Sequence, residues 1–136
     1  MLNFLQFLTE DTRATQAPTV EVEFTDEFEA WWNTLSGDEQ DLISAVVLRL
    51  SDEGIALGYP YSSAIKTSRH KGMRELRINN KGLLIRVFYI FDPRRVALLL
   101  AGANKRGWPG NMDRFYEHFV PVADGIYDEH LRQIGR

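Results

Sequence analysis

The residues of this sequence that could do chemistry are cations concentrated in its middle third. Between Ala64 and Arg106, eleven lysines and arginines stand against two acids, Glu75 and Asp92, so this segment has a net charge of +9. The rest of the chain carries −12, and the whole chain −3. A strongly basic segment within an acidic chain predicts a partner that is rich in phosphate.

Several of these cations fall on predicted strands. Side chains alternate along a strand, so in the run MRELRI (residues 73–78) Glu75 and Arg77 share the face opposite to that of Leu76 and Ile78. Arg86 is the one charge in the apolar run LLIRVFYIF. A guanidinium in such a strand must find phosphate, carboxylate or water, and Glu75 could supply the carboxylate in a buried salt bridge.

Converging guanidinium and ammonium groups suit the attack of a ribose 2′-hydroxyl on its own 3′-phosphate. Negative charge builds on the phosphoryl oxygens during this reaction, and fixed cations stabilise it without a metal. A base must take the 2′-proton, and an acid must protonate the leaving 5′-oxygen. The candidates are lysines with a lowered pKa, His70 and Glu75. The competing interpretation is that the cations are solvated surface residues or partners of the chain's own acids.

Other classes of site are disfavoured. The chain has no cysteine, which excludes disulfides, Cys-ligated metals and a thiol nucleophile. Its three histidines lack the helical spacing of a zinc hydrolase, and it contains neither a phosphate-binding P-loop nor a Gly-x-Ser-x-Gly turn. We therefore expect no metal and no other cofactor. Trp108 lies in a loop with Gly and Pro and could stack on a nucleobase.

The sequence also bears on location. No apolar run approaches the roughly 20 residues of a membrane-spanning helix. The opening MLNFLQFLTE has no basic residue before its apolar stretch, as a secretory signal would. We expect a cytoplasmic protein with no membrane contact.

The elements that position the cations follow from hydrophobic periodicity. Residues 19–24 alternate between apolar and polar, which predicts a strand. Two amphipathic helices follow over 25–35 and 36–54, with Thr25 as the cap of the first and a Ser36/Glu39 capping box opening the second. The Gly-, Pro- and Ser-containing stretch 54–72 is expected to be a loop.

Three more strands are predicted over 73–78, 83–91 and 94–101, and their short turn sequences favour an antiparallel meander. A last helix begins after Asn111, and Pro121 is expected to kink or restart it. The order β-α-α-β-β-β-α predicts a single α+β domain over residues 19–136, with a small, mostly antiparallel sheet and a helical hairpin on one face. Residues 1–18 are expected to be a flexible tail.

The order and spacing of these motifs resemble the RelE/ParE superfamily of toxins, and within it the HigB-like branch. The resemblance extends from Val20 to about Leu131 and is carried by MRELRI, LLIRVFYIFDPRRVALLLAGANKR and the lysine of AIKTSRHKG. The stretch FYEHFVPVADGIYDEHL also resembles a helix of one subgroup. The resemblance implies a RelE-like fold.

The resemblance further implies the toxin of a type II toxin–antitoxin system, a metal-independent endoribonuclease (mRNA interferase) that cuts mRNA on the ribosome and so inhibits translation. It implies a cognate antitoxin, often of the helix-turn-helix type. Carried over by position, it assigns catalytic roles to Lys66, Glu75, Arg77, Arg86 and Lys105. The residues predicted to bind RNA are His70, Lys71, Arg74, Arg106 and Trp108. The general acid stays open because the extreme C-terminus has no tyrosine or histidine, the nearest being Tyr127 and His130.

Two other functions are compatible with the same residues. One is a ParE-like toxin that inhibits DNA gyrase without cutting nucleic acid, and the other is an RNA-binding module that has lost catalysis. The ribonuclease hypothesis requires that several cations meet on one exposed concave surface, close enough to hold a single ribose-phosphate unit.

Overall fold

A six-stranded sheet organises the chain, in the order β1-β2-β6-β5-β4-β3. The computed structural model describes residues 2–4 and 19–135. The predicted meander is formed by β4 (Arg74–Asn80), β5 (Leu83–Phe91) and β6 (Ala97–Asn104), with antiparallel pairing throughout. β2 (Val22–Phe24) extends the sheet by pairing parallel to β6. β5 is buried at most positions, as expected of an apolar strand that is covered on both faces.

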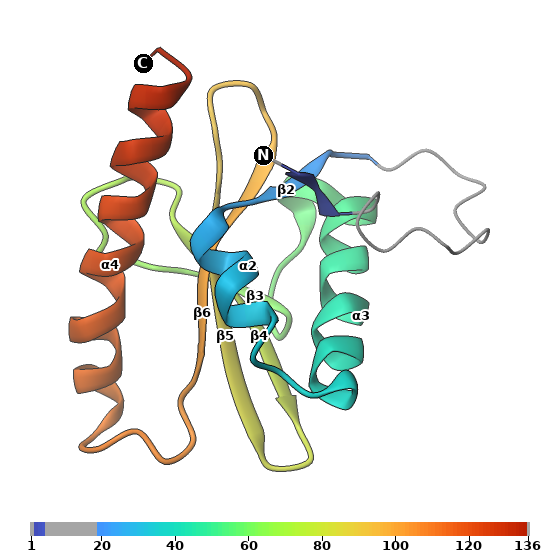
Figure 1. Ribbon diagram of the computed structural model, residues 1–136, viewed down its shortest axis with the longest axis vertical. Coiled ribbons are helices and arrows are strands. Elements are labelled where there is room, and N and C mark those ends of the chain that lie inside the picture. The colour runs from blue at the N-terminus through green and yellow to red at the C-terminus, as the bar shows by residue number, and fades with distance from the viewer. Residues whose placement is uncertain (1, 5–18, 136) are drawn as a thin grey trace.

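Helices cover the two faces of the sheet (Figure 1). The predicted hairpin, α2 (Asp26–Trp32) and α3 (Gly37–Glu53), lies on one face, and α4 (Met112–Gln133) on the other. The caps form as the sequence predicts: Thr25 Oγ1 accepts from Phe28 N, and Ser36 and Glu39 form a capping box. Alternation along the strands therefore builds two cores, one on each face.

Several strands and helices begin or end at other residues than the sequence predicts. A short strand, β3 (Ser62–Ala64), pairs with β4 inside the stretch that we expected to be a loop, which also contains the 3₁₀ turn η1 (Gly54–Ala56). β6 begins three residues late because the Asp92 carboxylate accepts from the backbone N–H groups of Arg94 and Val96, which holds a turn there. α4 runs unbroken through Pro121.

The start of the chain takes part in the fold. Leu2–Asn3 form β1, which pairs antiparallel with β2, and Phe4 is fully buried with its ring edge-on to Phe24 and Trp32. Residues 2–4, which we expected to belong to a tail over residues 1–18, are therefore part of the sheet and core, and residues 5–18 lie outside the described part. Within the described ranges, no helix is both long and apolar enough to cross a bilayer.

Candidate active site

Five polar side chains meet between the sheet and the N-terminal half of α4, and we call them the cation cluster: Glu75, Arg77, Arg86, Lys105 and Tyr116. The register of the sheet explains four of them. Arg77 pairs directly with Arg86 across β4 and β5, and Glu75 lies two residues before Arg77 on the same face. Lys105 follows β6 and is held there by a hydrogen bond from its N–H to Leu84 O, 2.8 Å long.

The Glu75 carboxylate is the hub of the cluster. Its Oε2 accepts from Arg77 Nη1 at 3.1 Å and from Ser63 Oγ at 2.8 Å. Its Oε1 accepts from the Tyr116 hydroxyl at 2.7 Å and lies 3.7 Å from Arg86 Nε. One buried carboxylate is therefore shared by two guanidinium groups, with the Lys105 ammonium close by. The cluster contains three basic side chains and a single acid.

The guanidinium groups are incompletely satisfied by the protein. Arg86, 2% exposed, donates from Nη1 to Asn79 Oδ1 at 2.7 Å and to Ile85 O at 2.9 Å. The buried Nε atoms of Arg86 and Arg77 have no hydrogen-bond acceptor among the described residues. A buried donor without an acceptor is costly, and two neighbouring guanidinium groups with spare donors match the oxygens of a phosphate.

Lys105 is the group in the cluster best suited to exchange a proton near neutral pH. Burial, together with the positive charges of Arg86 and Arg77, lowers its pKa to about 8, although Glu75 opposes this. Its Nζ donates to the Tyr116 hydroxyl at 3.3 Å. Burial and the hydrogen bond to Glu75 raise the pKa of Tyr116 to about 12, so the tyrosine stays protonated and acts as a donor.

Arg74, predicted to bind RNA, lies away from the cluster. Arg74 faces the opposite side of the sheet, where its Nε donates to Ser62 Oγ at 2.9 Å. The alternation that places Glu75 and Arg77 together puts Arg74 on the other face. Lys66 and Lys71 are exposed on the connection between β3 and β4, and neither forms an ion pair with the described residues.

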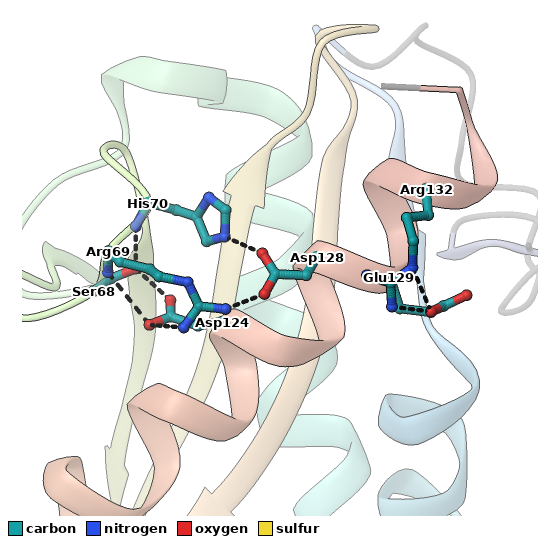
Figure 2. A network of polar contacts seen from close by, with 7 residues as sticks. All are labelled: Ser68, Arg69, His70, Asp124, Asp128, Glu129 and Arg132. Carbon is teal, nitrogen blue, oxygen red and sulfur yellow. Dashed lines mark hydrogen bonds and ion pairs between the residues drawn. The ribbon is translucent and has the colours of Figure 1, made fainter.

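His70 contacts the C-terminal half of α4 and not the cation cluster. Its Nε2 lies 2.7 Å from Asp128 Oδ1, and Arg69 pairs with the same carboxylate and with Asp124, as Figure 2 shows. The hydrogen bond with His70 lowers the pKa of Asp128, and Arg69 adds to the effect. His70 therefore ties its loop to α4 and does not reach the cluster.

The remaining two predicted RNA-binding residues flank the cluster. Arg106 is exposed just beyond Lys105, with its guanidinium over Gly82 in the turn between β4 and β5. Trp108 is half-buried against α4, with ring centroids 5.1 Å from Phe119 and 5.2 Å from His118. Trp108 thus packs against the helix, and only part of its ring is open to a ligand.

Sequence reasoning missed Tyr116, Ser63 and Asn79. Tyr116 contacts Glu75 from 41 residues away, so no local pattern reports it. Ser63 lies in β3, which is too short for its alternation to be visible. Asn79 was assigned to a turn, whereas β4 continues through it.

The cluster is also less open than predicted. Glu75 is 3% exposed and Lys105 7%, and the Arg77 side chain, at 19%, is the most accessible of the four charged ones. The expected convergence is present, but Tyr116 and α4 lie over it in place of an exposed concave surface. In the described part of the chain, no three His, Asp or Glu side chains gather as they would to hold a metal ion.

Comparisons with known proteins agree with this architecture. A family described as phage-derived Gp49-like protein (DUF891) matches residues 30–128. One chain of the E. coli DinJ–YafQ toxin–antitoxin complex matches with a TM-score of 0.51 at 10% identity, covering 67% of this chain and 98% of that one. The likeness concerns the fold and confirms the expected RelE-like α+β architecture.

Two relatives from Mycobacterium tuberculosis carry the names of toxins. HigB2 is 38% identical over 105 residues, which are 76% of this chain and 51% of HigB2. HigB3 is 35% identical over 96 residues, 71% of this chain and 80% of HigB3. The chain thus spans about half the length of HigB2 and most of that of HigB3.

Proposed function

The chain belongs to the family of phage-derived Gp49-like proteins, and we propose that it is the toxin of a type II toxin–antitoxin system, an endoribonuclease that cuts mRNA and so inhibits translation. The names of HigB2 and HigB3 support the toxin assignment, and the chain of similar fold comes from a toxin–antitoxin complex. On the same basis we propose a cognate antitoxin as the protein partner. From the resemblance of the sequence to RelE/ParE toxins, we propose the ribosome as the place of cleavage.

One observation carries the ribonuclease proposal: Arg77 of β4, Arg86 of β5 and Lys105, which follows β6, lie around one carboxylate, and the two arginines retain unsatisfied donors. Arg77 and Arg86 bind the non-bridging oxygens of the scissile phosphate and stabilise the charge that builds there. Glu75 holds both guanidinium groups in place through its two oxygens.

The cluster also supplies a base. Lys105 in its neutral form takes the 2′-proton as the 2′-oxygen attacks phosphorus. The bond from phosphorus to the 5′-oxygen then breaks, and the 5′-oxygen takes up a proton from water as it leaves. The products are a 2′,3′-cyclic phosphate and a 5′-hydroxyl, and no step requires a metal.

The test is cleavage of mRNA by the purified protein, on programmed ribosomes and on free RNA, the latter with a chelator present. We expect Arg86→Ala to reduce the rate by about 10²-fold or more, since it removes a donor aimed at the developing charge. The matched control is Arg132→Ala, an exposed arginine at the far end of α4. Thermal unfolding of each variant separates loss of chemistry from loss of fold.

Two results would contradict the proposal. Full cleavage by an Arg77→Ala/Arg86→Ala double variant would remove the assigned roles. Intact RNA together with blocked DNA supercoiling by gyrase would favour a ParE-like toxin instead.

A further inference from the structure

The buried position of the cation cluster limits how an RNA strand can reach it. Two hollows of about 300 Å³ each adjoin the cluster, on different sides. The first, which we call the helix hollow, contains Tyr116. Among the described residues it is lined by no lysine or arginine and by three carboxylates: Asp113, Glu117 and Asp124, the last of which is paired with Arg69. Phosphates lying in the helix hollow would be repelled.

The second hollow, which we call the edge groove, lies between α3 and the end of β4. Its polar lining consists of Arg49, Tyr61, Arg77, Asn79 and Asn80, over an apolar floor from α3, and among the described residues no carboxylate lines it. Arg49 also forms an exposed ion pair with Glu53, which lies outside the lining. Two of these residues belong to the site as well: Arg77 binds Glu75, and Asn79 accepts from Arg86. The edge groove therefore adjoins the cluster at the edge strand β4, next to Arg77, the most accessible cation of the cluster.

The shortness of β3 creates the edge groove. β3 pairs with β4 only over residues 74–76, and the last contact on this side is the hydrogen bond from Arg77 N to Tyr61 O. Beyond that point β4 is the edge of the sheet, and Asn79 and Asn80 are exposed. This leaves one side of the strand end open to a ligand.

Two tyrosines at the edge groove are each paired with an arginine. Tyr59 is 78% exposed, and the centroid of its ring lies 5.3 Å from Arg77 Cζ, whereas Arg49 Cζ lies 4.2 Å from the centroid of the Tyr61 ring. Tyr59 belongs to neither core, so packing does not account for it. Exposed aromatic rings interleaved with cations are the means by which proteins bind single-stranded nucleic acid.

We propose that the edge groove binds the single-stranded RNA adjoining the scissile phosphate, with backbone phosphates at Arg49 and Arg77 and a base stacked on Tyr59. This inference rests on the proposed ribonuclease function and names the path of its substrate. An arginine-lined groove without carboxylates attracts a polyanion, and the acid-lined helix hollow keeps it from the other side.

The experiment measures binding of a fluorescein-labelled 2′-O-methyl octaribonucleotide, which cannot be cleaved, to the full chain by anisotropy at several salt concentrations. We expect Tyr59→Ala to weaken binding about tenfold through the lost stacking. Arg49→Ala should weaken binding and reduce the slope of log K against log salt by about 0.7, the value for one lost phosphate contact on a single strand. Both side chains are exposed, so both variants should fold, which thermal unfolding checks.

The controls distinguish the edge groove from general charge effects. Arg132→Ala removes an arginine of the same exposed kind from the far end of α4 and should bind the probe like the wild type. Asp113→Ala, in the helix hollow, should leave binding unweakened. A marked loss with either control would contradict the proposed path.

The outcomes also separate this inference from the proposed function. If Tyr59→Ala and Arg49→Ala bind the probe and cleave mRNA like the wild type, the edge groove is wrong and the ribonuclease stands. If the wild type neither binds the probe nor cleaves RNA, the ribonuclease itself fails. If the two variants keep the probe but lose a co-expressed antitoxin, the free edge of β4 binds a protein strand and the RNA path is overturned.

Discussion

The two halves of α4 contact the rest of the molecule through opposite electrostatic arrangements. At the N-terminal half, Tyr116 lies over a cluster in which three cations share the one carboxylate of Glu75. At the C-terminal half, basic and acidic side chains are matched in number, and we call this region the helix lock: Arg69, His70, Arg94 and His130 with Glu23, Asp92, Asp124 and Asp128. Figure 2 shows the part of the helix lock around Asp124 and Asp128.

The difference separates a structural region from a functional one. Each acid of the helix lock has a basic partner, and these pairs hold α4 against the sheet and its loops, although the buried Nδ1 of His130 has no hydrogen-bond partner among the described residues. Surplus cations in a buried place destabilise the fold, and they persist where a ligand or a reaction uses them. The comparison therefore predicts that removing a charge has opposite effects on stability at the two ends.

The largest effect on stability is expected at the centre of the helix lock. The Asp92 side chain is fully buried, 2.8 Å from His130 Nε2 and 2.7 Å from Arg94 Nη2. Burial raises the pKa of Asp92, but the hydrogen bonds from His130 and Arg94 outweigh this and lower it. Asp92→Ala leaves both partners without their carboxylate and should reduce the free energy of unfolding by about 3–5 kcal/mol, measured by urea unfolding.

The control for Asp92→Ala is Arg69→Ala, which removes an exposed member of the helix lock. Because exposed ion pairs contribute little, its melting temperature should fall by no more than a few degrees. Cleavage per folded molecule should be unchanged in both variants. A specific loss of cleavage at Asp92 would mean that the two regions are not separate.

The next effect is on the pH dependence of cleavage. With a pKa of about 8, the neutral fraction of Lys105 rises from about 1% at pH 6 to about half at pH 8, so the rate should increase roughly fifty-fold over that range. Arg86 and Arg77 lower this pKa and Glu75 opposes them, so the profile reports on the whole cluster. Lys105→Arg keeps the charge and should abolish the rise, and a rate in the wild type that is flat with pH would exclude Lys105 as the base.

The smallest predicted effect is on the free energy of unfolding, and its sign is opposite to that expected for Asp92→Ala. In the folded protein the pKa of Lys105 lies below its usual 10.5, so folding disfavours the charged form, and this penalty is fully present below pH 8. Lys105→Met removes the penalty and should increase the free energy of unfolding at pH 7 by roughly 1–3 kcal/mol while abolishing cleavage. At pH 11 both chains have a neutral side chain, and the gain should disappear. Destabilisation at pH 7 would show that the surplus cation is part of the structural framework.

Much of the fold was predictable because its signals are local. Hydrophobic periodicity located α2, α3 and the three strands of the meander, and the capping residues set the starts of the helices. β3 was missed because three residues show no periodicity. The end of β4 and the start of β6 differ from the prediction, because backbone pairing and the turn held by Asp92 decide these boundaries, and composition does not.

The candidate site, too, was predictable where its signals are local and was missed where they are not. Period-two alternation and the register of a meander bring Glu75, Arg77 and Arg86 to one face, and both can be read from the order of residues. The partners of these residues come from far along the chain: Tyr116 lies 41 residues from Glu75, and Asp128 lies 58 residues from His70. His70 and Trp108 were assigned to RNA by residue type, and contacts with α4 account for most of their surroundings.

By itself, the order of amino acids determined which cations share a face, because alternation along a strand is a property of the backbone. Only the packing of α4 against the sheet decided how deeply they are buried and that Tyr116 shares their carboxylate. That packing joins side chains distant in sequence, and their proximity depends on the whole fold and on no local pattern.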